Sequence, residues 1–200
     1  MLVVISPAKK LDENCDKNLI NKFTMPSYLE NSKKIIKVLR KYSTGNLSKL
    51  MNISEKISIL NYDRYIKWSL PFNKNNSYQA LLLFQGDVYK GISASDFKEE
   101  DFVFAQKSLR ILSGLYGILK PLDLIQPYRL EMATKFPIKN NKNLYEFWKD
   151  KVTSFLNEEL EEGELFVNLA SNEYFSVINP RVLNSQVITP QFKDFKNGTL

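Results

Sequence analysis

Apolar residues recur at helical spacing in three regions of the chain. Between residues 26 and 42 the apolar positions fall on one helical face, and Pro26-Ser27 is a typical helix opening. The pattern over residues 47–60 predicts one or two short helices, with Ser54 as an N-cap. Apolar positions over residues 143–160 predict a longer helix.

Four short apolar runs between turn-forming residues predict strands. They comprise residues 2–5, 80–84, 165–169 and 186–189. Short strands that alternate with helices indicate an α+β fold, in which helices flank a mixed α/β sheet. The chain has 200 residues, of which 44% are hydrophobic, so we expect one domain with a sizeable core over residues 1–200.

Residues 102–125 contain the most distinctive local pattern. Apolar residues at helical spacing over residues 102–112 predict a helix that ends at Ser113-Gly114, and Gly117 then allows a second short helix at residues 118–119. Two helices joined by Gly-x-x-Gly would form a helix-hairpin-helix element, whose glycine amides can approach a phosphate group. Alternatively, the two glycines only form a tight corner in the core, and the motif alone does not decide between these interpretations.

Polar residues follow three of the predicted strands, at residues 6–10, 85–89 and 170–174. Open α/β sheets bind ligands at the carboxyl ends of their strands, so we expect these loops to line one cleft. Ser6 and Lys9 are the candidate phosphate-binding residues of that cleft.

An enzyme that acts on a nucleotide or a nucleic acid base is the alternative function. Its candidate acid and base groups are Asp87, Glu173, Tyr174 and Glu131. Such side chains also serve as structural caps, so the sequence leaves catalysis open.

Composition narrows the possible chemistry and location. The chain has no histidine, which is the commonest general base and metal ligand, so we expect no metal site and no cofactor. No run approaches the roughly 18 apolar residues of a membrane span, and the first ten residues do not resemble a secretory signal. A single cysteine, Cys15, forms no disulfide framework. We therefore expect a cytoplasmic protein without a membrane partner.

The formal charge of +6 is distributed unevenly along the chain. Residues 1–75 contain 14 Lys and Arg against 6 Asp and Glu, whereas residues 131–200 contain 8 against 10. An anionic partner such as nucleic acid fits this asymmetry, and so does a biased genome composition.

Five segments resemble the YaaA family of bacterial peroxide-stress proteins. In chain order they are ISPAK at residues 5–9, FQGDVYKG at 84–91, the block LRILSGLYGILKPLDLIQPYRLEM at 109–132, LYEFW at 144–148 and NLASNEYF at 168–175. The resemblance spans nearly the whole chain, and the block at 109–132 is its most specific part.

The resemblance implies a cytoplasmic DNA-binding protein of the hydrogen peroxide response, which limits damage linked to peroxide and to unincorporated iron. It also implies the fold called the cantaloupe fold, with a helix-hairpin-helix element at about 102–125. The expected partner is duplex DNA, bent or interrupted, bound in a basic cleft by a monomer. The DNA-binding residues implied are Lys9, Lys10, Arg110, Ser113, Gly114, Leu115, Tyr116, Gly117, Lys120, Tyr128 and Arg129.

Two features depart from the family pattern. Lys10 stands where the family usually has threonine, which adds positive charge. Family members continue past this chain's last residue with a further strand and a basic segment, so we expect that the C-terminal part of the family domain is missing. Asn197-Gly198 is a predicted hairpin turn near that end.

Overall fold

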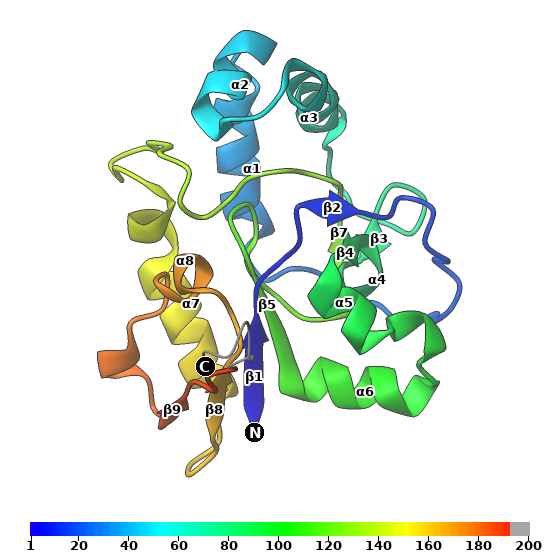
Figure 1. The fold of residues 1–200 in the computed structure, drawn as a ribbon, viewed down its shortest axis with the longest axis vertical. Coiled ribbons are helices and arrows are strands. Elements are labelled where there is room, and N and C mark those ends of the chain that lie inside the picture. Colours follow the sequence, from blue (N-terminus) through cyan, green and yellow to red (C-terminus); the bar gives the residue numbers. More distant parts are fainter. Residues whose placement is uncertain (193–200) are drawn as a thin grey trace, which may run out of the picture.

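A computed structural model of the protein describes residues 1–192. Its centre is a five-stranded sheet with the strand order β6-β5-β1-β8-β9 (Figure 1). The strands are β1 Leu2–Ile5, β5 Leu109–Ser113, β6 Gly117–Leu119, β8 Phe166–Asn168 and β9 Val187–Ile188. β1 pairs in parallel with β5 and β8, β8 pairs in parallel with β9, and β6 is antiparallel to β5. The predicted mixed α/β sheet with flanking helices is confirmed.

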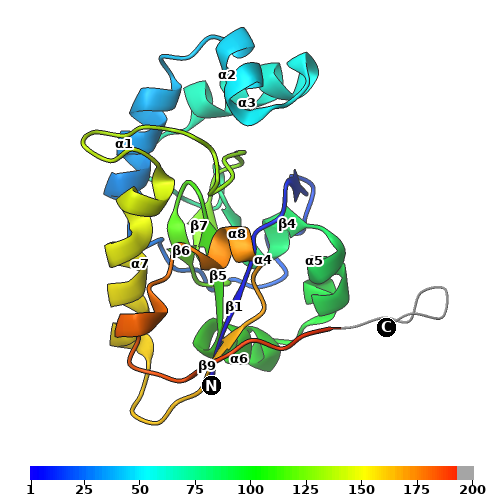
Figure 2. The ribbon, with the colours of Figure 1, turned by 60° about the vertical axis from the view of Figure 1, so that its left-hand side comes forward.

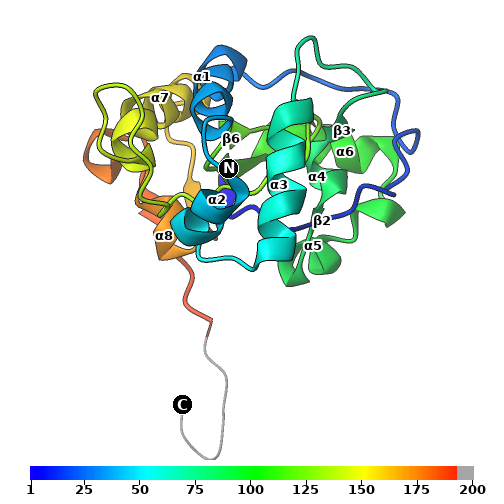
Figure 3. The same cartoon turned by 90° about the horizontal axis from the view of Figure 1, so that it is seen from above.

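Three consecutive helices form a lobe beyond the carboxyl ends of the central strands (Figures 1 and 2). They are α1 Leu29–Leu39, α2 Thr44–Met51 and α3 Glu55–Lys67, and we call them the α1–α3 lobe. Seen from above, α2 and α3 lie in front of the sheet (Figure 3).

The remaining helices lie around the sheet. α7, Leu144–Glu159, packs against β6, and α6, Glu99–Ser108, packs against β1 and β5. Shorter helices are α4 Ala80–Leu83, α5 Asp87–Ile92 and α8 Asn172–Phe175, with 3-10 turns η1 Ala94–Asp96 and η2 Pro180–Val182. Two small antiparallel ladders pair β2 Lys10–Leu11 with β4 Phe84–Gln85, and β3 Tyr78–Gln79 with β7 Leu124–Ile125.

Local sequence signals explain the starts of three helices. The side chains of Ser43, Ser54 and Asn143 each accept a hydrogen bond from a backbone N–H in the first turn of α2, α3 and α7. The predicted helices over residues 26–42, 47–60 and 143–160 are therefore confirmed, and so are the strands predicted at 2–5, 165–169 and 186–189.

Two elements predicted before the Gly-x-x-Gly turn are wrong. Residues 80–83 are helical, because a short apolar run does not distinguish a buried helical turn from a strand. The helix predicted over residues 102–112 already ends at Ser108, and residues 109–113 form strand β5. Leu109 to Ile111 pair with β1 along the full register, so sheet pairing overrides the helical spacing of the apolar side chains.

The helix-hairpin-helix element is not confirmed. Residues 118–119 belong to β6, so the Gly-x-x-Gly turn joins two antiparallel strands. A Cβ at Gly114 would lie 2.2 Å from the carbonyl oxygen of Leu130. Gly117 has φ +75°, and its Cβ would lie 2.7 Å from Cε3 of Trp148. Both glycines thus allow close packing in the core.

Within residues 1–192, no helix has the length and hydropathy to cross a lipid bilayer. The predicted Asn197-Gly198 turn lies outside the described residues.

Candidate functional site

The order of the strands defines one topological switch point. From β1 the chain proceeds to β5 on one side, whereas from β8 it proceeds to β9 on the other side. In open α/β sheets the connections separate at such a point and leave a crevice beyond the carboxyl ends of the strands. Residues 6–9 and 169–174 leave β1 and β8 there, side by side.

Ser6 and Ser171 join the two strand ends. The Oγ of Ser6 accepts a hydrogen bond of 2.9 Å from the backbone N–H of Ser171 and donates one of 3.3 Å to the Ser171 hydroxyl. The hydroxyl of Tyr89 in α5 donates to the carbonyl oxygen of Ser6 at 2.9 Å. These bonds hold the floor of the crevice in place.

Glu131 lies between two cations beside the crevice. Its Oε1 is 3.1 Å from Nζ of Lys9 and 2.9 Å from a guanidinium nitrogen of Arg129. The carbonyl oxygen of Arg129 accepts from the hydroxyl of Tyr65, which fixes the backbone. Among residues 1–192, the buried Nε of Arg129 has no hydrogen-bond partner.

Glu173 and Tyr174 complete the polar lining. Glu173 accepts a hydrogen bond of 3.0 Å from the backbone N–H of Ala133, and its carbonyl oxygen accepts one from Tyr145. Burial raises the pKa of Tyr174, and the neighbouring Tyr128, Glu173 and Glu131 add to the shift. The phenol therefore keeps its proton at neutral pH and can donate a hydrogen bond.

Several of these residues line a cleft of about 530 Å³, which we call the strand-end cleft. Its lining includes Ser6, Lys9, Asn168, Ser171, Glu173 and Tyr174. The alternative acid and base candidates Glu131, Glu173 and Tyr174 therefore lie together at or beside it. Asp87 does not line the cleft; it is exposed, pairs with Lys90, and the next residue, Val88, reaches the cleft instead.

Several residues implied in DNA binding are buried elsewhere. Arg110 is 2% exposed and, together with Lys120, pairs with Glu159 of α7. Burial acts to raise the pKa of Glu159, but the bonds from Lys120 and Arg110 outweigh it and hold the pKa below its usual range. Both cations are therefore committed to one ion-pair cluster with Glu159.

The turn at residues 113–117 is buried throughout. Tyr128 is also buried, and its hydroxyl lies 2.6 Å from that of Ser113. A phosphate has no access to Ser113, Gly114, Leu115, Tyr116, Gly117 or Tyr128 in this arrangement. Of the residues implied in DNA binding, four have exposed or partly exposed side chains: Lys9, Lys10, Lys120 and Arg129.

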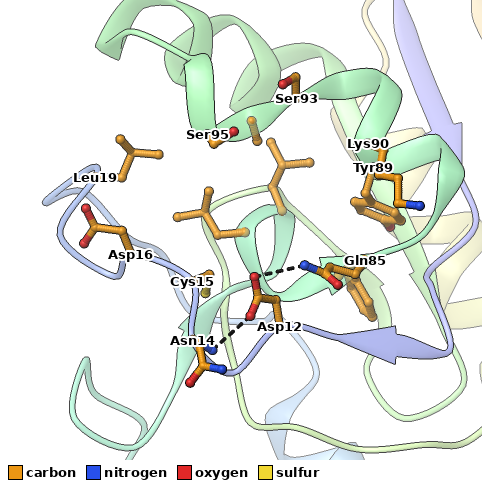
Figure 4. A pocket seen from close by; sticks show the side chains of 14 residues that line it. Asp12, Asn14, Cys15, Asp16, Leu19, Gln85, Tyr89, Lys90, Ser93 and Ser95 are labelled. Carbon is orange, nitrogen blue, oxygen red and sulfur yellow. Dashed lines mark hydrogen bonds between the residues drawn. The ribbon is translucent and has the colours of Figure 1, made fainter.

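A second cavity, of about 620 Å³, lies between the residue 12–19 loop and α5 (Figure 4). The carboxylate of Asp12 accepts hydrogen bonds from Gln85 at 2.9 Å and from the backbone of Asn14 at 3.0 Å. Burial, followed by the charge of Asp12, raises the pKa of the Cys15 thiol to about 11. Among residues 1–192, no group of three or more His, Cys, Asp or Glu side chains is placed to hold a metal ion.

The strand-end cleft unites segments that are far apart in sequence. ISPAK contributes Ser6 and Lys9, NLASNEYF contributes Ser171, and FQGDVYKG contributes Val88. The block at 109–132 supplies Arg129 and Glu131 beside the cleft, while Tyr145 of LYEFW supports Glu173. Sequence reasoning missed Ser171, although it follows β8 as Ser6 follows β1.

A sequence model of the family described as "Peroxide stress protein YaaA" matches residues 1–200. The chain belongs to the YaaA family. It is 52% identical over 200 residues to a UPF0246 protein of Saccharophagus degradans, with 99% of this chain and 78% of the relative covered. It is 52% identical over 201 residues to the UPF0246 protein FP0718 of Flavobacterium psychrophilum, with 100% and 79% covered.

Membership of the YaaA family confirms the resemblance seen in the sequence and identifies a peroxide stress protein. The UPF0246 names of the relatives state no ligand or reaction.

Proposed function

We propose that this YaaA-family protein acts in peroxide stress by binding the sugar–phosphate backbone of DNA, and that the α1–α3 lobe makes the main contacts. The observation that carries the proposal is the charge of this lobe. Residues 29–67 contain nine Lys and Arg against three Asp and Glu, a net charge of +6 that equals the formal charge of the whole chain.

Most of these cations are available to a ligand. Six exposed lysines of the lobe form no ion pair with residues 1–192: Lys34, Lys37, Lys41, Lys49, Lys56 and Lys67. The two arginines have structural roles, since Arg40 donates to carbonyls at the end of α3 and Arg64 pairs with Glu13. Exposed lysines that neutralise phosphates release counterions, which drives nucleic acid binding.

The position of the lobe supports an extended binding surface. The lobe and strand β2, which contains the exposed Lys10, lie toward the carboxyl end of the sheet, whereas α6 lies at the opposite end (Figure 1). Contacts of this kind reach phosphates and not base edges, so we expect little sequence preference. Bent or interrupted duplexes should bind best if the DNA follows a curved surface, because they deform at lower cost.

The Gly-x-x-Gly turn has no part in this proposal, because its residues are buried. Lys9 and Arg129 are also left out of the main contact set, since both are already paired with Glu131.

Fluorescence anisotropy with plain, nicked and bent duplexes at several salt concentrations tests the proposal. The variant Lys34→Glu/Lys37→Glu reverses two charges of α1, and Lys98→Glu/Lys107→Glu reverses two on or beside α6 as a charge-matched control. We expect wild type and control to bind with a steep salt dependence. Losing two phosphate contacts should reduce the slope of log K against log salt by about 2.

Two results would contradict DNA binding through the lobe. One is wild-type binding that is absent or independent of salt. The other is an equal loss of binding in the α1 variant and in the α6 control.

A further inference from the structure

We propose that the strand-end cleft binds a small phosphorylated molecule, namely a phosphomonoester with an aromatic or apolar body, of which a mononucleotide is the simplest probe. This site is separate from the DNA-binding lobe and does not depend on it. The inference starts from the convergence of Ser6, Lys9, Ser171 and Tyr174 at the topological switch point of the sheet.

The size and shape of the cleft suit such a ligand. Its volume of about 530 Å³ falls within the roughly 300–1,000 Å³ of small-molecule sites. Its walls come from four segments of chain, including the turns after β1 and β8, which are hydrogen-bonded to each other. The polar groups are therefore held in fixed positions before any ligand arrives.

Ser171 and Lys9 provide the donors for a phosphate. The Ser171 hydroxyl accepts a hydrogen bond from Ser6 and donates to no group within residues 1–192, so its own proton is available. The side chain of Lys9 is 69% exposed, and its Nζ lies 3.1 Å from Oε1 of Glu131. Water reaches the Lys9 end of this pair and weakens the attraction, so Lys9 can exchange the carboxylate for a phosphate oxygen.

Arg129 allows this exchange because it keeps the carboxylate of Glu131 paired. When Lys9 turns to the phosphate, Glu131 keeps its bond of 2.9 Å to Arg129. Arg129 itself lies beside the cleft, and its Nε is buried without a partner among residues 1–192. Lys9 thus offsets part of the phosphate charge while the Arg129–Glu131 pair stays intact.

The rim of the cleft provides apolar surface for the body of the ligand. Val88, Leu169 and Phe192 line it and are 54%, 43% and 87% exposed. Thr189 and Asn168 add hydrogen-bonding groups on the same side. A flat ring that covers these apolar side chains removes them from water. The edge of the ring can form hydrogen bonds with Thr189 and Asn168.

The ionic groups of the cleft favour a single phosphate over a long polyanion. Lys9 and Arg129 are balanced by Glu131 and Glu173, so the cleft has no net charge to attract a DNA strand. The lysines of the α1–α3 lobe have no such balance. Substitutions in the strand-end cleft should therefore change nucleotide binding, and substitutions in the α1–α3 lobe should change DNA binding.

Isothermal titration calorimetry with deoxyadenosine monophosphate tests the proposal on the full chain. Ser171→Ala and Lys9→Ala each remove one phosphate donor; Ser171 makes no side-chain cap to α8, so its loss should not disturb the fold. Lys10→Ala is the matched control, because Lys10 is exposed and does not line the cleft. Circular dichroism melting verifies that all variants are folded.

We expect saturable binding that weakens about tenfold or more in Lys9→Ala and measurably in Ser171→Ala, while Lys10→Ala binds as the wild type does. Inorganic phosphate should compete, and deoxyadenosine should compete more weakly than the nucleotide. Absence of binding, equal binding by all variants, or competition by deoxyadenosine but not by phosphate would overturn the proposal. Lys34→Glu/Lys37→Glu should keep nucleotide binding, so loss of DNA binding alone leaves this inference standing.

Discussion

The indole of Trp148 lies directly against Gly117, and the same side chain donates a hydrogen bond of 3.0 Å from Nε1 to the carbonyl oxygen of Gly114. A single residue of α7 thus contacts both glycines of the β5–β6 turn. The turn is thereby fixed to the helix, and this contact explains the Gly-x-x-Gly spacing without a ligand.

Gly117→Ala should destabilise the fold. The new Cβ would meet the Trp148 ring at 2.7 Å, and φ of +75° is unfavourable for any side chain. We expect the free energy of unfolding in urea to fall by about 3 kcal/mol. Gly45→Ala is the control: a Cβ there has nothing within 4 Å, and in helix α2 alanine should stabilise by up to about 1 kcal/mol. Equal effects at the two positions would contradict this explanation.

Glu159→Gln should weaken the link between α7 and the sheet. The change removes the carboxylate that pairs with the guanidinium of Arg110. The Arg110 side chain is only 3% exposed. We expect the free energy of unfolding to fall by about 3 kcal/mol at neutral pH, because the remaining charge is buried. Glu30→Gln, which breaks the exposed pair with Lys33, should have little effect.

The effect of Glu159 should also depend on pH. Its folded-state pKa is lowered, so the stability that the charged form contributes is present above the unfolded-state pKa of about 4.3. That contribution is lost as the pH falls through the lower, folded-state pKa. The difference between wild type and Glu159→Gln should therefore shrink in acid, and a difference that grows there would refute the assignment.

Asp123 should show the opposite pH dependence. Burial raises its pKa, although hydrogen bonds from Thr24 at 2.6 Å and from the backbone of Lys120 at 2.8 Å favour the charged form. Between the ordinary pKa of about 3.9 and the raised value, the folded state holds more protons than the unfolded state. Wild type should therefore lose stability relative to Asp123→Asn as the pH rises through this window.

Urea titrations of the two proteins from acid to neutral pH measure this relative stability. Asparagine can accept from Lys120 and donate to Thr24, so the variant retains both contacts. A difference in stability that does not change with pH would show that Asp123 is not proton-linked to folding.

Cys15 should be a poor sensor of peroxide. Its pKa of about 11 leaves the thiol protonated at neutral pH, and the thiolate is the form that peroxide oxidises. We expect iodoacetamide to label Cys15 slowly at neutral pH and much faster above pH 11, as measured by mass spectrometry. The protein unfolded in urea is the control and should label quickly. Rapid labelling of the folded protein at neutral pH would disprove the raised pKa.

The sequence alone determined the elements whose signals are local. Helices α1 and α7 have a clear apolar face, and Ser54 and Asn143 mark helix starts with their own side chains. The run LVVI at residues 2–5 reads as a buried strand wherever it lies in the sheet. Periodicity and capping act within one or two turns of chain, so no tertiary information is needed for them.

Only the tertiary structure decided the roles of residues 109–117 and of the cleft. Leu109 and Leu112 fit a helical face and a buried strand equally well, and pairing with β1 selects the strand. Burial then gives Gly114 and Gly117 a packing role that their spacing does not reveal. Ser6 and Ser171 meet because β1 and β8 are adjacent parallel strands, although 165 positions separate them in the chain. Long-range pairing brings such groups together, and it depends on the whole sheet rather than on any single segment.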